Sequence, residues 1–271
     1  MTTSQVLAAP APPPTLAGLR SALSAGQVVV RYQPVVQLAD GAPVAVEVLA
    51  RLARPGGGLI EPADFVPRME AAGLAWRLTQ AVFRCAFAEW REFGLGGLGM
   101  ALAVNVPLDA MLRRGAASWI ERERRAAGLP AALLILELTE SRPVNDIPAL
   151  REAVARLRAY GYRLAIDDVG PAGRAPENLL DMPFSIMKLD QNLVAEVGRS
   201  EPARAFLIRA VAAARIAGMR IVAEGIEDQP TWQRMQSLGV DEGQGFAIAR
   251  PLTAEALRGW RQRWLGPRAA H

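Results

Sequence analysis

Short apolar runs alternate with longer segments of helical period throughout residues 28–260, and no other feature of this sequence constrains the fold as strongly. Nearly continuous apolar strands separated by helices are typical of a parallel sheet that is buried on both faces. About eight such strands in about 240 residues predict an α/β fold of the (β/α)8 barrel type rather than an open sheet. The predicted strands are VVVRYQPVV, VAVEVLA, GMALAVNV, LLILELT, RLAIDDV, SIMKLD, RIVAEGI and QGFAIA, and the amphipathic stretches cover residues 65–90, 147–161, 201–218 and 229–239.

A single domain is expected over residues 16–265, since no change of composition divides this part of the chain. Residues 1–15 are rich in alanine and proline and lack the basic segment and apolar core of a secretory signal. We therefore expect a flexible tail there, and a second short tail over residues 266–271. No apolar run is long enough to cross a bilayer. The sequence favours a free-standing cytoplasmic module with no membrane partner.

One cysteine and one histidine limit the chemistry that the chain can perform. Cys85 lies in a helical pattern and is expected in the core, while His271 is the last residue. These positions exclude Ser-His-Asp and Cys-His nucleophilic sites and the usual zinc sites. The net charge of +4 comes with arginines that alternate with glutamates along helices. This pattern favours a solvated helix face over a surface for nucleic acid.

Polar side chains follow the apolar part of nearly every predicted strand, at the point where a barrel opens. A single acid in such a place is more often a helix cap or a solvated loop residue than part of a site. Seven strands that bring polar groups to one rim indicate instead a shared site at the mouth of the barrel. These residues are Glu47, Asn105, Glu137, Asp167, Asp168, Lys188, Glu224 and Gln244.

Several carboxylates in one mouth repel each other unless cations lie between them. Mg²⁺ and Mn²⁺ prefer oxygen ligands and keep positions open for water and phosphate, and the adjacent Asp167 and Asp168 suit a bridge between two ions. Such a pair of ions supports phosphodiester hydrolysis. Acidic neighbours hold Lys188 in its ammonium form, which suits contact with water or phosphate and disfavours the alternative of Schiff-base chemistry.

Several short motifs occur in a fixed order along residues 18–260, and together they are highly specific. They are RYQPVVQLADG, EVLAR, AVNV, LELTES, IDD, KLD, AEGIE and QGFAIARP. In this order and spacing the chain resembles the EAL-domain phosphodiesterases of bacterial cyclic di-GMP signalling. The resemblance implies a modified (β/α)8 barrel whose first strand runs antiparallel to the others. It also implies hydrolysis of cyclic di-GMP to linear pGpG.

The resemblance further implies a role for each residue that matches a motif. The implied metal ligands are Glu47, Asn105, Glu137 and Asp167, with Asp168 at a second ion. Lys188 and Glu224 would act around the attacking water, with Glu224 as the general base. The implied substrate contacts are Gln33, Arg51 and Gln244. Glu140 would anchor the loop that follows the paired aspartates.

The loop after the paired aspartates departs from the family's pattern. The family typically reads DDFGTGYSSL where this chain reads DDVGPAGRAP, without a gap. Hydroxyl groups that can bond the backbone and Glu140 are replaced, and Pro171 and Pro176 fix φ and remove donors. A smaller departure is Val48, where the family usually has alanine.

Two hypotheses follow from intact ligands beside an altered loop. One is a working phosphodiesterase that is slow or depends on a partner to order the loop. The other is a cyclic di-GMP receptor that binds without cleavage and acts through a protein partner. We favour the enzyme because every implied ligand is present. Members of the family often dimerise near this loop, so a homodimer is also expected.

Overall fold

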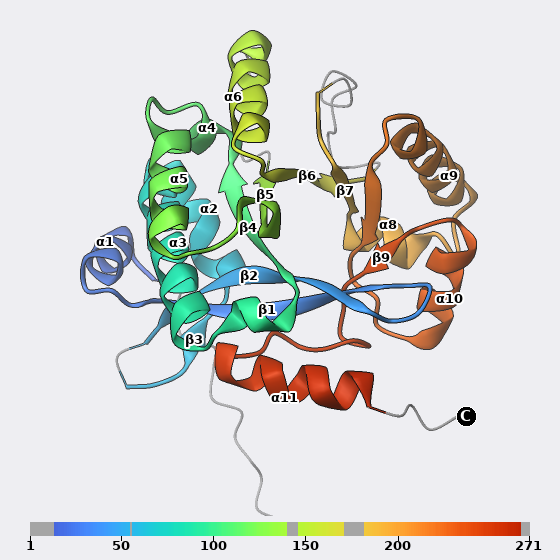
Figure 1. Cartoon of the computed structure of the whole chain (residues 1–271), viewed down its shortest axis with the longest axis horizontal. Helices are drawn as coiled ribbons and strands as arrows, with labels where there is room; N and C mark the ends of the chain where they lie inside the picture. The colour runs from blue at the N-terminus through green and yellow to red at the C-terminus, as the bar shows by residue number, and fades with distance from the viewer. Residues whose placement is uncertain (1–13, 55, 140–145, 171–181, 267–271) are drawn as a thin grey trace, which may run out of the picture.

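The computed structural model of the chain describes residues 14–54, 56–139, 146–170 and 182–266, and among these the strands close into a barrel with helices around it (Figure 1). The short strand β3 (Leu59–Ile60) extends the sheet outside the barrel by pairing with β2. The barrel strands are β1 (Val28–Gln37), β2 (Pro43–Ala53), β4 (Ala101–Pro107), β5 (Leu134–Thr139), β6 (Arg163–Val169), β7 (Ile186–Leu189), β8 (Arg220–Ala223) and β9 (Glu242–Gly243).

Strand β1 is antiparallel to both of its neighbours, β2 and β9, whereas each other pair of adjacent barrel strands is parallel. The connection between β1 and β2 covers only residues 38–42, which is too short for a parallel crossover and produces a hairpin. The expected modified (β/α)8 barrel with an antiparallel first strand is therefore confirmed.

The described helices lie mainly in the connections between parallel strands and cover the outside of the barrel. In Figure 1, α11 runs along the β1–β2 ribbon, while α9 and α10 lie across the barrel from α2, α3 and α5. Their bounds are α1 (Leu16–Ser24), α2 (Pro62–Ala71), α3 (Ala75–Glu92), α4 (Leu108–Met111), α5 (Ala116–Ala126), α6 (Ile147–Ala159), α8 (Gln191–Glu196), α9 (Glu201–Ile216), α10 (Gln229–Ser237) and α11 (Ala254–Leu265), with 3₁₀ turns at Leu95–Leu98 and Ala131–Leu133.

Local sequence explains where several helices begin and end. Side chains of Asp146, Ser200 and Asp228 accept hydrogen bonds from the first turns of α6, α9 and α10, as N-cap residues do. The amphipathic stretch of residues 65–90 contains two helices, because Gly73 adopts a left-handed φ of 69° between α2 and α3. Described helices include none that is long and apolar enough to cross a membrane.

A small apolar layer fills the barrel interior below the mouth. Successive side chains of a strand point to opposite faces, so the residue two positions further along shares the interior face. Moving two positions toward the mouth from members of this layer gives Gln33, Glu47, Asn105, Glu137, Asp167, Lys188 and Glu224. The layer consists of Val35, Ala45, Ala101, Ala103, Ile135, Ala165, Ile186 and Val222.

One expectation about the strands was wrong. The last strand is Glu242–Gly243 and not residues 244–249, which form a turn closed by hydrogen bonds from Ile248 and Ala249 to the Gly245 carbonyl. Strand β2 includes the predicted residues 44–50 and continues to Ala53, because β1 goes on pairing with it. Cys85 is half-buried and packs against the core, where its thiol lies 3.1 Å from the Val28 carbonyl oxygen.

Candidate active site

Lys188 stands at the centre of the barrel mouth, on β7, and only 2% of its surface is exposed. Its ammonium faces carboxylates delivered by four other strand positions around the barrel. The distances from Lys188 Nζ are 2.6 Å to Glu224 Oε1, 3.0 Å to Asp167 Oδ1, 3.2 Å to Glu137 Oε2 and 3.6 Å to Glu47 Oε2. Lys188 is also the only lysine in the chain.

The surrounding charges decide the protonation of Lys188. Burial alone would lower its pKa, but the carboxylates, Asp167 and Glu137 first, outweigh burial and raise the pKa well above its usual range. The pKa of Glu137 is also raised well above its ordinary value, because burial and the charges of Glu47 and Asp167 outweigh the attraction of Lys188. Lys188 therefore stays protonated, and its single positive charge is shared among several carboxylates.

Glu47 is held ionised by two amides as well as by Lys188. Asn105 Nδ2 donates to Glu47 Oε1 at 2.8 Å, and Gln244 Nε2 donates to Glu47 Oε2 at 2.6 Å. Burial would raise the pKa of Glu47, but Lys188 and these two hydrogen bonds together lower it. Gln244 Nε2 also donates to Gln33 Oε1 at 3.0 Å, and Gln33 lies directly opposite Glu47 in the β1–β2 pairing.

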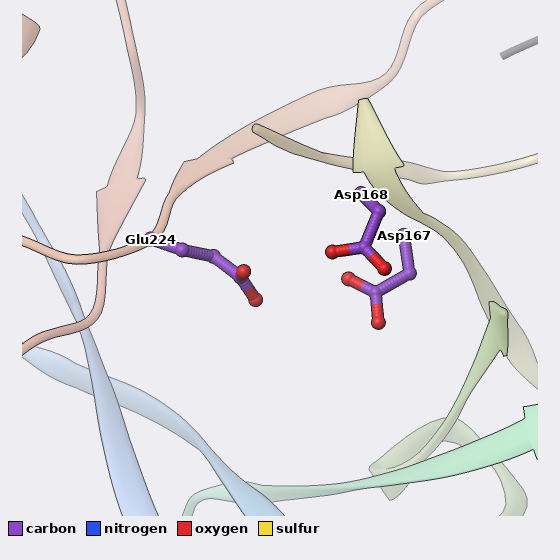
Figure 2. Close-up of side chains that lie close together, drawn as sticks. All are labelled: Asp167, Asp168 and Glu224. Carbon is purple, nitrogen blue, oxygen red and sulfur yellow. The ribbon is translucent and has the colours of Figure 1, made fainter. Parts of the chain in front are cut away.

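Three carboxylates form a compact cluster at the top of the site. Oxygens of Asp167, Asp168 and Glu224 all lie within 4.8 Å of one another, and Figure 2 shows Glu224, which directly follows β8, pointing toward the two aspartates of β6. Burial, then the charge of Asp167, raises the pKa of Glu224 to about 8 against the opposing effect of Lys188. Burial and the charge of Asp167 also raise the pKa of Asp168.

Asp168 has an unusual backbone conformation. Its φ of 56° is the one left-handed value of a non-glycine residue among the described residues, and it coincides with a register shift in the β6–β7 pairing between Ile166 and Val169. Without this irregularity, consecutive aspartates would point to opposite faces of the strand. The irregular backbone therefore lets both carboxylates reach the same cluster.

The donor set fits divalent cations that prefer oxygen ligands. Five carboxylates and one ammonium would leave four negative charges if all the groups were ionised. Within the described part of the chain, the buried oxygens Glu137 Oε2 and Asp167 Oδ1 accept no hydrogen bond, and both have the Lys188 ammonium as their charge partner. One ammonium shared among several carboxylates, together with raised carboxyl pKa values, is the expected sign of a site that accommodates further positive charge. The cluster could therefore hold a metal ion.

A cavity of about 370 Å³ opens beside this cluster and has mostly polar walls. Gln33, Arg51 and Gln244, the three predicted substrate contacts, all line it. Arg51 is 7% exposed, and its guanidinium pairs with Glu61 at 2.9 Å. An apolar cavity of about 410 Å³ lies between β2, α2 and α3, and it shares Leu49 and Asn105 with the polar one.

The structure thus brings ten of the eleven predicted site residues to one mouth: Gln33, Glu47, Arg51, Asn105, Glu137, Asp167, Asp168, Lys188, Glu224 and Gln244. The eleventh, Glu140, lies outside the described residues, as do residues 171–176 of the altered loop. Val48 belongs to the outer core rather than the barrel interior, so its extra methyl groups do not face Lys188.

Sequence analysis did not single out several residues that line the polar cavity, among them Gln191, Glu227 and Phe246. Glu227 follows Glu224 by three positions beyond the end of β8, and this position near a strand end was an available signal. Phe246 gave no such signal, because residues 244–249 (QGFAIA) were predicted to form a buried strand.

Comparison with known proteins identifies the family. A family model described as "EAL domain" matches residues 17–251. The chain belongs to the EAL domain family. This EAL domain is 33% identical over 232 residues to the cyclic di-GMP phosphodiesterase PA2567 of Pseudomonas aeruginosa, an alignment covering 86% of this chain and 40% of that protein. It is 31% identical to the cyclic di-GMP phosphodiesterase RocR of the same organism, covering 88% of this chain and 61% of RocR.

Solved structures give the same result. The phosphodiesterase PaMucR in complex with c-di-GMP superposes on this EAL domain with a TM-score of 0.81 and 32% identity, covering 89% of this chain and 98% of that one. An EAL domain protein from Listeria monocytogenes superposes with a TM-score of 0.80 at 19% identity, which supports the fold alone. The chain spans 40% of PA2567 and 61% of RocR.

Proposed function

We propose that this EAL domain is a phosphodiesterase that hydrolyses cyclic di-GMP to linear pGpG with two divalent ions, Mg²⁺ or Mn²⁺. The observation that carries the proposal is the single site in which Lys188 faces four carboxylates beside a polar cavity. Three further facts support it: the family, the names of PA2567 and RocR, and the c-di-GMP bound to the 32% identical PaMucR.

The proposed ligands belong to two metal-binding positions. Divalent ions bound there would lower the pKa of water and stabilise charge on phosphate oxygens. At the first position the ligands would be Glu47, Asn105, Glu137 and Asp167, and at the second Asp168. Because Asn105 donates through Nδ2 to Glu47, its carbonyl oxygen remains available as a ligand. Glu224 lies close enough to both aspartates to serve as a ligand or as a base.

Proton transfer would fall to Glu224. Its pKa of about 8 is within the range of an efficient general base near neutral pH, once added positive charge favours the carboxylate form. Lys188, 2.6 Å away, would keep Glu224 oriented and would neutralise charge that develops on the phosphate. Gln33, Arg51 and Gln244 would position the substrate from the walls of the polar cavity.

A turnover assay with purified protein, cyclic di-GMP and Mg²⁺ or Mn²⁺ tests the proposal, with products separated by chromatography. We expect pGpG from the wild type and none from Glu47→Ala, while Glu92→Ala, which removes an exposed carboxylate on α3, keeps full activity. Binding is measured in parallel with Ca²⁺ in place of the active ion. Absence of both binding and product would overturn the proposal.

A receptor without turnover is the second candidate, favoured by the replacement of the hydroxyl residues in the sequence of 171–176. A misplacement of about 1 Å at such a site costs on the order of 10²-fold in rate while leaving binding possible. Tight binding with Ca²⁺ and no pGpG with Mg²⁺ or Mn²⁺ would select this candidate. The search would then move to a protein partner.

A further inference from the structure

Gln244 links two residues of the barrel mouth, yet it follows the shortest strand of the barrel. Its Nε2 donates to Glu47 Oε2 at 2.6 Å and to Gln33 Oε1 at 3.0 Å. The preceding strand, β9, consists of Glu242–Gly243 alone. So short a strand has few ladder hydrogen bonds to define its register, and a slip by one residue would turn Gln244 away from the barrel interior. The register of β9 therefore depends on contacts beyond the strand itself.

Asp241, the residue before β9, is tied to β8 at two points. Asp241 N donates to the Ile221 carbonyl oxygen at 3.1 Å, and Ile221 N donates to Asp241 Oδ2 at 2.8 Å. On the other side, Leu38 N donates to the Asp241 carbonyl oxygen at 2.9 Å, and Leu38 directly follows β1. Because Asp241 engages both backbone groups of Ile221, β9 cannot slide along β8 without breaking these bonds.

Arg215 fixes the orientation of the Asp241 carboxylate. Its Nη2 donates to Asp241 Oδ1 at 2.9 Å and to the Gly239 carbonyl oxygen at 2.7 Å, from the last turn of α9. The two oxygens of Asp241 thus have different partners, Arg215 and Ile221. These partners hold the carboxylate in one orientation at the amino end of β9, while Gln244 follows its carboxyl end.

The backbone of β9 has little room to absorb a displacement. A Cβ on Gly243 would overlap Ile226 Cδ1 and would stand 2.8 Å from Leu38 Cδ2, so the strand is packed closely against both side chains. Gln244 N continues the ladder by donating to the Ala223 carbonyl oxygen at 2.9 Å. A shift at the amino end of β9 would therefore be passed on to Gln244.

We propose that Asp241, held by Arg215, is a positioning residue that sets the register of β9 and thereby places the Gln244 amide between Glu47 and Gln33. Asp241 is not among the residues that line the polar cavity, so it acts through Gln244 and not on the substrate. The proposal rests on the proposed function, in which Glu47 is a metal ligand and Gln244 contacts the substrate.

Kinetics of Asp241 variants in two backgrounds test this role. We expect Asp241→Ala to lower kcat/KM for cyclic di-GMP by roughly 10-fold, and Asp241→Asn, whose amide oxygen can still accept from Ile221, by less than about threefold. In a Gln244→Ala background, Asp241→Ala should have less than about a twofold further effect, since residues that act through one contact are not additive. Equal effects of Asp241→Ala in both backgrounds would overturn the proposal.

Ser200→Ala is the matched control. Ser200 is the N-cap of α9, the same helix that carries Arg215 in its last turn, so its removal destabilises that helix without breaking a contact to β9. We expect kcat/KM of Ser200→Ala to equal that of its parent in both backgrounds. A loss of activity in Ser200→Ala as large as that in Asp241→Ala would mean that general destabilisation explains both, and would overturn the proposal.

The side-chain amide of Gln244 provides a measurement that does not depend on turnover. In metal-free protein labelled with nitrogen-15 on glutamine, its NMR signal is assigned by its loss in Gln244→Ala. We expect Asp241→Ala to move this signal toward that of a free glutamine side chain, and Ser200→Ala to leave it in place. An unchanged signal in Asp241→Ala would overturn the positioning role. A wild type that neither binds nor cleaves cyclic di-GMP would overturn the proposed function alone, and the NMR signal would still decide the role of Asp241.

Discussion

Lys188 Nζ lies 2.6 Å from Glu224 Oε1, the shortest of its four contacts with carboxylates at the barrel mouth. The chain has 31 basic residues and uses lysine only here, with arginine everywhere else. An ammonium is a compact point charge that can face several acids at once, whereas a guanidinium is a wide planar fork suited to one. The geometry of the pocket therefore accounts for the choice of lysine.

A single lysine makes its protonation directly measurable. Because Asp167, Glu137 and Glu224 raise the pKa of Lys188 against the effect of burial, we expect its Cε resonance to show no titration below about pH 10.5, the ordinary lysine value. The measurement is carbon-13 NMR of protein labelled on lysine, in the metal-free state. A titration midpoint near neutral pH would contradict this and would revive Schiff-base chemistry.

Replacing Lys188 by methionine keeps much of its volume but removes the charge. Lys188 lowers the pKa of Glu224, so the variant should bring that pKa above its present value of about 8 and move the rising limb of the pH–rate profile to higher pH. We expect turnover at neutral pH to fall by about 10² or more. An unchanged profile, in a variant with a native circular dichroism spectrum, would exclude this role.

Asp168 combines a left-handed φ of 56° with a place in the acidic cluster, so its replacements by glycine and by alanine should lose the same activity but differ in stability. Asp168→Gly and Asp168→Ala both delete the carboxylate, but only glycine adopts this φ without strain. We expect both variants to lose turnover and the glycine variant to be more stable than the alanine variant by about 1 kcal/mol. Urea unfolding measures the difference, and equal stabilities would mean that the backbone relaxes.

Much of the barrel mouth could be predicted from the sequence, because the alternation of side chains along a strand depends only on neighbouring residues. In VAVE, LILE, LAID and SIMK, an interior apolar residue precedes the polar one by two positions, and the structure keeps this spacing at Glu47, Glu137, Asp167 and Lys188. Parallel strands then place equivalent positions at the same end. These polar side chains therefore meet at one mouth because side chains alternate along each strand and because the sheet closes into a barrel.

The features that sequence analysis missed depend on contacts between distant segments. The turn at residues 244–249 resembles a strand in its apolar content, but Gly245 lies against Ile226, which is close in space through β8 and not visible in the local pattern. Phe246 was hidden by the same error. Glu121 sits in a charged helix typical of a solvated face, yet it is buried and accepts a hydrogen bond from the hydroxyl of Tyr162, which is 41 positions away and directly precedes β6.

Gly245 should be among the least replaceable residues outside the cluster. A Cβ there would meet the Ile226 carbonyl oxygen at 2.1 Å and the Ile226 nitrogen at 2.3 Å, and backbone atoms cannot move as a side chain can. We expect Gly245→Ala to cost about 3 kcal/mol or more of unfolding free energy and to disturb the Gln244 contact with Glu47. Gly97→Ala, where nothing lies within 4 Å of the new Cβ, is the matched control.

Glu121 provides a pH-dependent contribution to stability far from the metal cluster. Hydrogen bonds from Arg124, against the effect of burial, and then from Tyr162 and Arg125, lower the pKa of Glu121 to about 2. A lowered folded-state pKa stabilises the protein above the unfolded-state value near 4.5, and this contribution is lost as the pH falls toward 2. We expect Glu121→Gln to reduce the unfolding free energy by about 1 to 2 kcal/mol at pH 7.

The pH dependence of that difference is the decisive measurement. Because the wild type loses the advantage of an ionised Glu121 on acidification, the gap between wild type and Glu121→Gln should shrink by roughly half or more from pH 7 to pH 3 in urea unfolding. The control Glu123→Gln removes a neighbouring carboxylate paired with exposed Arg122 at 3.3 Å, and such surface pairs contribute little. A gap that stays constant with pH would mean that the Glu121 side chain stabilises the protein by packing and not by its charge.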